Sequence, residues 1–212
     1  MNEENSCEIK KTIPSISDKK SLIFLGISIL VIAIIFLIIF FGAKHVDPYK
    51  PERVTYNYFD FVKKDTHWMT DWQGNNGLYE LGFRFNPLEA ETVQVSGSLN
   101  ESFNDRDVLY ITFDPLEKVQ HKYTALGAGE ILLVANRALH KNIEMACTQQ
   151  DDNACVDFPI ITCDSDASVI FLKPSAPTKV ELNNSCITIQ GEEMNLLKAI
   201  DRLLYQWLKI MR

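Results

Sequence analysis

Asp114 is the carboxylate with the strongest case for chemistry, because it follows an apolar run that ends at Phe113 and precedes a helix-forming segment. Catalytic groups of α/β enzymes often stand at such a strand end. His121 lies seven residues further along, about two helical turns away, so both side chains are candidates for a shared site. However, Asp114-Pro115 also suits a turn that caps the following helix, without any catalysis. Asp114 and His121 are therefore weak catalytic candidates.

The motifs of the common enzyme classes are missing from this sequence. It contains no H-E-x-x-H metal motif, no G-x-S-x-G nucleophile elbow and no Walker loop. Gly127-Ala128-Gly129 lacks the remaining spacing of a dinucleotide-binding loop. We therefore expect no metal and no cofactor, and we favour a protein that is not an enzyme.

The five cysteines fall on two sides of one apolar segment. Cys7 precedes this segment, whereas Cys147, Cys155, Cys163 and Cys186 follow it. An even number of cysteines in a compact domain predicts two disulfides, which persist on the oxidising side of a membrane. Four cysteines allow three pairings. We favour Cys147–Cys155 and Cys163–Cys186, because each closes a local unit; no pair has the C-x-x-C spacing typical of zinc or redox sites.

Two further pairs of residues are candidates for binding or modification. Trp68 and Trp72 are four residues apart in a predicted strand, so they share a face and form a candidate interaction surface for a sugar or a protein. The alternative is that both rings belong to the core, as large aromatic residues usually do. Asn100 and Asn183 begin N-x-S triplets, which are glycosylation acceptors on the extracytoplasmic side.

The segment from Leu22 to Ala43 contains no charged residue. A helix needs about 20 apolar residues to span a bilayer, and it satisfies its own backbone hydrogen bonds there. A cleaved signal peptide is the alternative, but its apolar region is shorter, about 7–15 residues, and ends in a small-x-small site. Phe41 is bulky where such a site needs a small residue. We therefore predict an uncleaved transmembrane helix over residues 21–43.

Charged residues and cysteines together predict the orientation. Four lysines precede the helix and three basic residues follow it, which is a small positive-inside difference. The cysteine distribution supports the same orientation, with a disordered cytoplasmic tail (1–20), a Pro-containing linker (44–53) and an extracytoplasmic disulfide-containing domain (54–212). The charges of the tail cancel, so the net charge of −7 belongs to the outer domain. This charge argues against nucleic acid as a partner.

The outer domain shows strands, then a helix, then strands and a final helix. We expect a long, well-buried helix over 116–146 and an amphipathic one that begins at Glu192 and Glu193. The expected strands are 54–61, 67–73, 78–85, 93–95, 108–113, 158–163, 169–172, 179–182 and 186–190. This pattern predicts an α+β domain, with two layers, an antiparallel or mixed sheet, a buried central helix and a C-terminal amphipathic helix; a three-layer α/β sandwich is the alternative.

Four short motifs follow the apolar segment in a fixed order: Tyr110-Ile-Thr-Phe-Asp-Pro115, Ile160-Ile-Thr-Cys163-Asp, Cys186-Ile-Thr-Ile-Gln-Gly191 and Asp201-Arg-Leu-Leu-Tyr205. With these motifs, the chain resembles a group of uncharacterised single-pass membrane proteins of small-genome (DPANN-type) archaea. The resemblance covers most of residues 54–212. It implies an archaeal envelope setting and supplies no activity or site residue.

The sequence is compatible with three kinds of function. The first is a membrane-anchored structural or interaction protein of the cell envelope, which binds a protein or glycan partner. The second is a membrane-tethered hydrolase or transferase that acts on envelope polymers, with Asp114 in its site. The third is an accessory subunit of a membrane complex. In each case we expect a single-pass protein of the cell membrane with its C-terminal domain outside.

Overall fold

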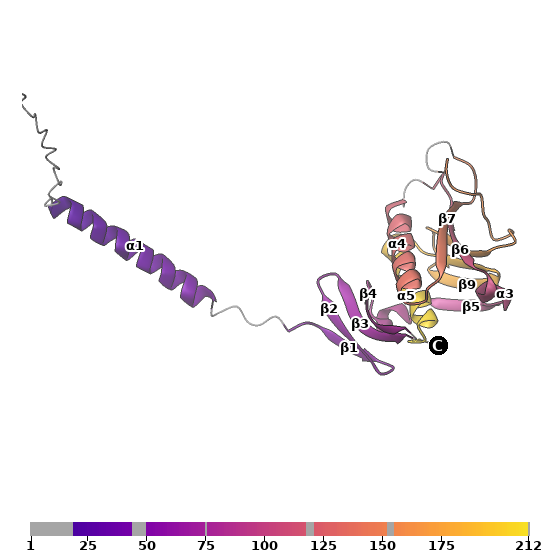
Figure 1. Cartoon of the computed structure of the whole chain (residues 1–212), viewed down its shortest axis with the longest axis horizontal. Coiled ribbons are helices and arrows are strands. Elements are labelled where there is room, and N and C mark those ends of the chain that lie inside the picture. The colour runs from indigo at the N-terminus through magenta and orange to yellow at the C-terminus, as the bar shows by residue number, and fades with distance from the viewer. Residues whose placement is uncertain (1–18, 44–49, 75, 118–120, 152–154, 212) are drawn as a thin grey trace, which may run out of the picture. The chain divides into compact units, whose positions relative to one another are not determined.

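The structure is a computed structural model that describes residues 19–43, 50–74, 76–117, 121–151 and 155–211 (Figure 1). Residues 1–18 of the predicted tail and most of the predicted linker lie outside the described residues. The chain divides into two units, Met1–Lys50 and Pro51–Arg212. We describe each unit by itself.

The first unit contains helix α1, Lys19–Ala43. Its segment Ile23–Phe41 has a mean hydropathy of 3.4, and none of this segment is buried against the rest of the chain. The helix is long enough and apolar enough to cross a membrane. Its bounds agree with the predicted span to within two residues at its start. An apolar helix of this kind suggests a membrane anchor.

The second unit is an α+β domain with two sheets, and this fold class is the predicted one. The first sheet is antiparallel in the order β1-β2-β3-β4. Its strands are β1 (Arg53–Tyr56), β2 (Phe59–Lys64), β3 (His67–Gly74) and β4 (Gly77–Phe83). Two helices of one turn, α2 (Pro87–Ala90) and α3 (Ser102–Asp105), follow in the connections.

The second sheet is mixed and has the order β5-β9-β10-β8-β6-β7. Neighbouring strands are parallel except β9 and β10, which form an antiparallel hairpin. Its strands are β5 (Gln94–Leu99), β6 (Val108–Phe113), β7 (Asn142–Cys147), β8 (Ser168–Lys173), β9 (Lys179–Asn184) and β10 (Cys186–Gln190). Helices α4 (His121–Arg137) and α5 (Met194–Trp207) cover one face of this sheet (Figure 1).

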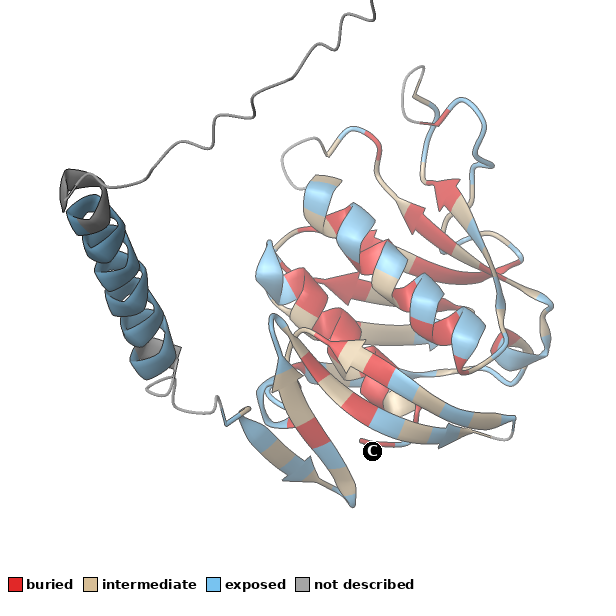
Figure 2. Cartoon of the chain, turned by 60° about the vertical axis from the view of Figure 1, so that its left-hand side comes forward, coloured by how far each residue is buried: buried red, intermediate tan, exposed pale blue. Residues whose placement is uncertain are grey.

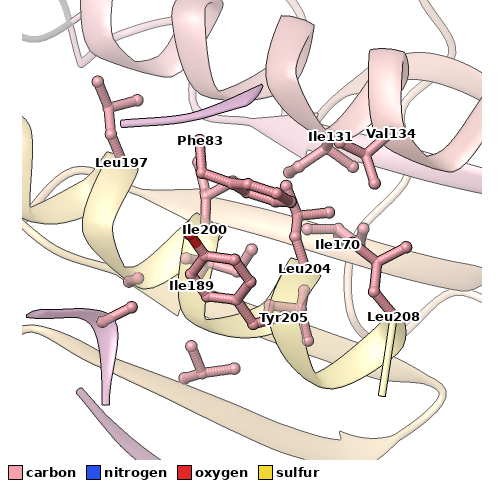
Figure 3. Packing of buried hydrophobic residues seen from close by; sticks show 14 of the residues in the cluster. Phe83, Ile131, Val134, Ile170, Ile189, Leu197, Ile200, Leu204, Tyr205 and Leu208 are labelled. Carbon is pink, nitrogen blue, oxygen red and sulfur yellow. The ribbon is translucent and has the colours of Figure 1, made fainter. Parts of the chain in front are cut away.

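Helix α5 lies between the two sheets, and its side chains form the centre of the core (Figure 3). Leu197, Ile200 and Leu204 form part of its apolar stripe and are at most 1% exposed. On the side of the first sheet, the Tyr205 ring lies 4.4 Å from that of Phe83, centroid to centroid. The predicted amphipathic helix therefore buries apolar residues against both sheets.

The far face of the six-stranded sheet carries a second, smaller cluster, formed by Ala167, Val169 and Cys186. The segment that follows β7 covers part of this face, where the Thr112 hydroxyl donates to the Ile161 carbonyl at 2.7 Å. Side chains of a strand alternate between faces, which is why Ile170, next to Val169, belongs to the main core. The long loop after β7 thus completes a buried layer.

Three predicted elements differ from the structure. The strand expected over 54–61 is a hairpin, because Asn57 and Tyr58 have φ values of 45° and 71° and form its turn. The helix expected over 116–146 divides into α4 and the parallel strand β7. The strand expected over 158–163 is reduced to one bridge between Cys147 and Ile160. Helix α5 also begins slightly later than expected, at Met194.

Helix α4 is buried on one face only, contrary to the expectation that it is buried on nearly all sides (Figure 2). Ile131, Val134 and Ala135 point into the core, whereas Leu126 and Leu133 are 45% and 56% exposed. The spacing of apolar residues along a helix cannot show which face is buried when both the inner and the outer face are apolar. The apolar outer face of α4 is therefore a surface and not part of the core.

Alanine substitutions at Gly127 and Gly129 of α4 should change the free energy of unfolding in opposite directions. A Cβ at Gly127 would lie 2.2 Å from Ile200 Cδ1, a fully buried side chain. Overpacking of about 1–3 kcal/mol, offset by about 1 kcal/mol of helix propensity, means that Gly127→Ala should lower the free energy of unfolding by up to about 2 kcal/mol. A Cβ at Gly129 meets no atom within 4 Å, so Gly129→Ala should raise it by up to about 1 kcal/mol through helix propensity. Urea unfolding of both variants measures these changes, and equal effects would contradict the packing of α4 on α5.

Candidate functional site

Asp114 lies in the turn that follows β6. Its Oδ1 accepts hydrogen bonds from the Leu116 backbone N–H at 2.9 Å and from Gln149 Nε2 at 2.8 Å. The Asp114 carbonyl also accepts from the Glu117 backbone N–H at 3.3 Å. These contacts are those of an Asx-type turn, in which a short acidic side chain satisfies nearby backbone donors. The structure therefore gives Asp114 a local structural role.

His121 begins α4 and lines a small apolar cavity of about 260 Å³ together with Phe113, Met145 and Phe158. Its Nε2 atom is buried and has no hydrogen-bond partner among the described residues. Within the same described part of the chain, no hydrogen bond joins His121 to Asp114. Among the described residues, the contacts of Asp114 are those of a turn, and His121 lines an apolar cavity.

The four cysteines of the domain form two pairs at disulfide distance, Cys147 with Cys155 and Cys163 with Cys186. Their Cα–Cα distances are 6.2 Å and 5.2 Å, which are typical of disulfides. The first pair joins the end of β7 to its loop. The second joins that loop to the start of β10. The two cysteine pairs therefore attach the loop over the far face of the sheet, one near its start and one further along it.

The two tryptophans of β3 share a face but differ in burial. Trp68 is 3% exposed, so it belongs to the core and is not available as an interaction surface, contrary to that interpretation of the sequence. Trp72 lies nearer the end of the strand and is half-buried. Its Nε1–H donates to the Leu208 carbonyl at 3.0 Å, and its ring packs on Tyr79 of β4. Burial therefore decreases along β3, and only Trp72 reaches the surface.

Asn100 and Asn183 are both exposed. Asn100 directly follows β5, and Asn183 lies near the end of β9. These two strands are parallel neighbours, with Leu99 of β5 paired with Asn184 of β9. The Asn100 backbone N–H donates to the Asn184 carbonyl at 2.9 Å. The structure thus places both N-x-S triplets at one edge of the six-stranded sheet, a proximity that sequence spacing does not reveal.

A buried acidic residue that the sequence analysis did not identify connects α5 to β4. Asp201 is 1% exposed, and its Oδ2 accepts from the backbone N–H groups of Arg84 at 2.9 Å and Phe85 at 2.8 Å. Burial, together with repulsion by Glu130, raises the pKa of Asp201 well above its usual range. The signal in the sequence is a charged residue within the apolar stripe of α5, next to Ile200.

Glu130 of α4 lies beside this carboxylate and forms a mostly buried ion pair with Arg84 Nε. Burial raises the pKa of Glu130, while Arg84 opposes that shift. The Tyr205 hydroxyl donates to the Phe85 carbonyl at 2.7 Å. This network satisfies the backbone at the end of β4 and joins the first sheet to α4 and α5, so we interpret it as a structural connection.

The arrangement best suited to binding is a groove of about 540 Å³ beside the end of α5. We call it the aromatic groove. Its lining includes Phe59, Trp72, Gln73, Asn76, His140 and Trp207. Trp207 comes from α5 and Trp72 from β3, so the two indole rings meet in one site only through the tertiary fold. The volume is within the range of small-molecule sites, roughly 300–1,000 Å³.

Polar side chains around the aromatic groove complement its rings. Gln73 and Asn76 are exposed, and an amide supplies both hydrogen-bond donors and acceptors. His140 is also exposed, and its Nε2 lies 3.5 Å from the Tyr79 hydroxyl. Gly74 is needed here because a Cβ would lie 2.4 Å from the Trp72 ring. The groove can therefore offer aromatic side chains together with amide groups and the ammonium group of Lys209.

Among the described residues no group of three or more His, Cys, Asp or Glu side chains is placed to hold a metal ion. Comparison with known proteins gives no relative: no protein-family model, no curated protein and no solved structure matches the chain.

Proposed function

We propose that this chain is a membrane-anchored interaction protein of the cell envelope, with a glycan-binding domain on a single-pass anchor. The apolar helix α1 supports the anchor, and the two cysteine pairs support an oxidising compartment for the domain. We further propose that the N-terminus is cytoplasmic and, from the resemblance, that the envelope is archaeal.

The observation that carries the glycan proposal is the aromatic groove, in which Trp72 and Trp207 lie with Gln73, Asn76 and His140. Indole rings can stack on the apolar C–H faces of a sugar, while amide groups bond its hydroxyls. Lys209 also lines the groove, and its ammonium group can donate to saccharide hydroxyls as the amides do. The groove therefore suits a hydroxyl-rich saccharide. Binding alone needs no nucleophile and no general base, which agrees with the structural role of Asp114.

Replacing both Gln73 and Asn76 with alanine is expected to weaken saccharide binding by about 5-fold to 100-fold. Two hydrogen bonds of about 0.5–1.5 kcal/mol each would be lost, and 1.4 kcal/mol corresponds to a factor of ten. The full chain in detergent is first tested on an array of hexose and N-acetylhexosamine oligosaccharides. Titration calorimetry then compares the dissociation constants of both proteins for the best-bound oligosaccharide.

The matched control for this experiment is Gln94→Ala, which removes an exposed amide from β5, outside the groove. This variant should bind like the unchanged chain. Absence of binding to every oligosaccharide of the array would overturn the glycan proposal. Equal binding by the unchanged chain and the Gln73/Asn76 double variant would place the saccharide somewhere other than the aromatic groove.

A second candidate function, an accessory subunit of a membrane complex, is favoured by the outer face of α4. Leu126, Leu132 and Leu133 are exposed there, and Gly129 leaves open space above the helix. Such a face suits a protein partner. If the array shows no binding, crosslinking in native cells should recover a stoichiometric partner attached to α4; a chain recovered alone would exclude this candidate.

A further inference from the structure

A second cavity, of about 460 Å³, shares Trp207 with the aromatic groove. Leu99, Leu109 and Leu182 come from three strands of the six-stranded sheet, and Leu203 comes from α5. Phe103 of α3 completes this apolar wall. We call it the basic cavity, because of the charged residues described next. Its apolar wall is continuous with the buried core, and its volume is that of a small-molecule site.

Every charged side chain that lines the basic cavity is a cation: Arg106, Lys141 and Lys209. Among the residues that the structure describes, no carboxylate lines it, although the chain as a whole has a net charge of −7. A random sample of this surface would contain more acidic than basic groups. The cavity therefore combines an apolar wall with a local positive potential, and this potential attracts anions.

Arg106 has hydrogen-bonding capacity that the described residues leave unused. One terminal nitrogen, Nη2, pairs with the exposed carboxylate of Asp166. The other, Nη1, is buried and has no partner among the described residues. A buried donor without a partner is unfavourable, so a shift of the Arg106 side chain that brings Nη1 to an anionic oxygen would be favoured. Lys141 Nζ donates to the Asn104 carbonyl at 2.8 Å, and an ammonium group has three donors.

We propose that the basic cavity binds an amphiphilic anion, with its hydrocarbon chain against the leucines and its carboxylate or phosphate oxygens at Arg106 and Lys141. An apolar wall alone would accept any hydrocarbon, whereas the cations select the charged head. This inference goes beyond glycan binding and does not depend on it. Trp207, Leu139 and Lys209 line both cavities, so a test must change residues that belong to the basic cavity only.

The experiment uses the full chain in nanodiscs of zwitterionic lipid and three photoreactive probes. Each probe carries a diazirine on a long alkyl chain that ends in a carboxylate, a monophosphate or a neutral alcohol. After irradiation, mass spectrometry measures labelling of peptides from the basic cavity (99–109 and 203–209) and from the apolar helix (23–41). Labelling of the helix peptide measures how much of each probe enters the bilayer. Dividing the labelling of the cavity peptides by that of the helix peptide therefore corrects for partitioning of the probe.

We expect an anionic probe to label the cavity peptides at least fivefold more than the alcohol, relative to the helix peptide. The double variant Arg106→Gln/Lys141→Gln should lose most of this labelling. The control Lys173→Gln removes an exposed cation of β8 that does not line the cavity, and it should label normally. Labelling by only one of the two anionic probes would support the proposal and identify the head group.

Three results would overturn the proposal: cavity labelling no greater than elsewhere in the domain, equal labelling by the alcohol, or unchanged labelling of the double variant. Urea unfolding, followed by tryptophan fluorescence, verifies that the double variant is folded. If it is not, the ratio between the anionic probes and the alcohol on the unchanged chain decides the question. The oligosaccharide array uses a different ligand and different variants, so failure of either proposal leaves the other intact.

Discussion

Reduction of both disulfides is expected to lower the free energy of unfolding of the domain by about 6 kcal/mol. Closing the loop between Cys147 and Cys155, which are 8 residues apart, should contribute about 2.5 kcal/mol by restricting the unfolded chain. Closing the loop between Cys163 and Cys186, which are 23 residues apart, should contribute about 3.5 kcal/mol. A loss of this size is comparable with the whole stability of a typical domain, about 5–15 kcal/mol.

Urea unfolding with and without reductant measures this effect. The three tryptophans, Trp68, Trp72 and Trp207, all lie in the domain, so their fluorescence reports its unfolding and not that of α1. The double variants Cys147→Ser/Cys155→Ser and Cys163→Ser/Cys186→Ser separate the two contributions.

Cys7→Ser is the matched control, since Cys7 is the one cysteine that precedes α1. It should leave the midpoint of unfolding unchanged. A midpoint that does not move on addition of reductant would contradict the two disulfides, and so would free thiols at these four cysteines in non-reducing peptide maps. It would also remove the main support for an oxidising compartment.

Replacing Asp201 with alanine is expected to lower the free energy of unfolding by about 3 kcal/mol. The carboxylate accepts from two backbone N–H groups at the end of β4, and alanine leaves both of them buried without a partner. Each such donor costs about 1–3 kcal/mol. Asparagine retains an oxygen acceptor, so Asp201→Asn should cost less than Asp201→Ala, although its added NH₂ group also needs a partner.

The stability of the unchanged chain should also depend on pH through Asp201. Its folded-state pKa is raised by burial and by Glu130, so the native protein binds a proton that the unfolded chain releases. This contribution to stability is complete below the unfolded pKa of about 3.9 and is lost as pH rises through the folded-state pKa. Stability relative to Asp201→Asn should therefore fall as pH rises from about 4. Glu130, whose pKa burial also raises, acts in the same direction.

Urea unfolding at a series of pH values tests whether the stability of the unchanged chain relative to Asp201→Asn falls as pH rises. Asp157→Asn changes an exposed carboxylate in the loop after β7, so it provides the control for a general effect of charge. Its stability relative to the unchanged chain should be nearly independent of pH. A curve for Asp201→Asn parallel to that of the unchanged chain would mean that Asp201 does not titrate differently in the folded and unfolded states.

Local patterns of the sequence determine a large part of this protein. The apolar run from Leu22 to Ala43 forms α1 because a helix of that length satisfies its own backbone hydrogen bonds. The stripe of Leu197, Ile200 and Leu204 forms α5 because a period of three and four residues gives one apolar face. The α+β class follows from the order of such elements. Each of these inferences needs only residues that are close along the chain.

Local patterns fail where one residue pattern is compatible with two structures. Asn57-Tyr58 forms a hairpin turn without the glycine that usually marks one, so the sequence suggests a single strand. The apolar segment after Asp114 is compatible with one long helix, and only pairing with β6 makes its final part the strand β7. Tertiary contacts override local propensity in both cases.

Only the tertiary structure determines the candidate sites, because their residues are far apart in the sequence. Trp72 and Trp207 form one groove, and the Trp72 indole bonds a carbonyl 136 residues away. Asp201 accepts from the Arg84 amide, 117 residues away. Whether a tryptophan is core or surface, as for Trp68 and Trp72, depends on what packs over it. Burial and proximity are properties of the folded chain, and spacing along the sequence does not contain them.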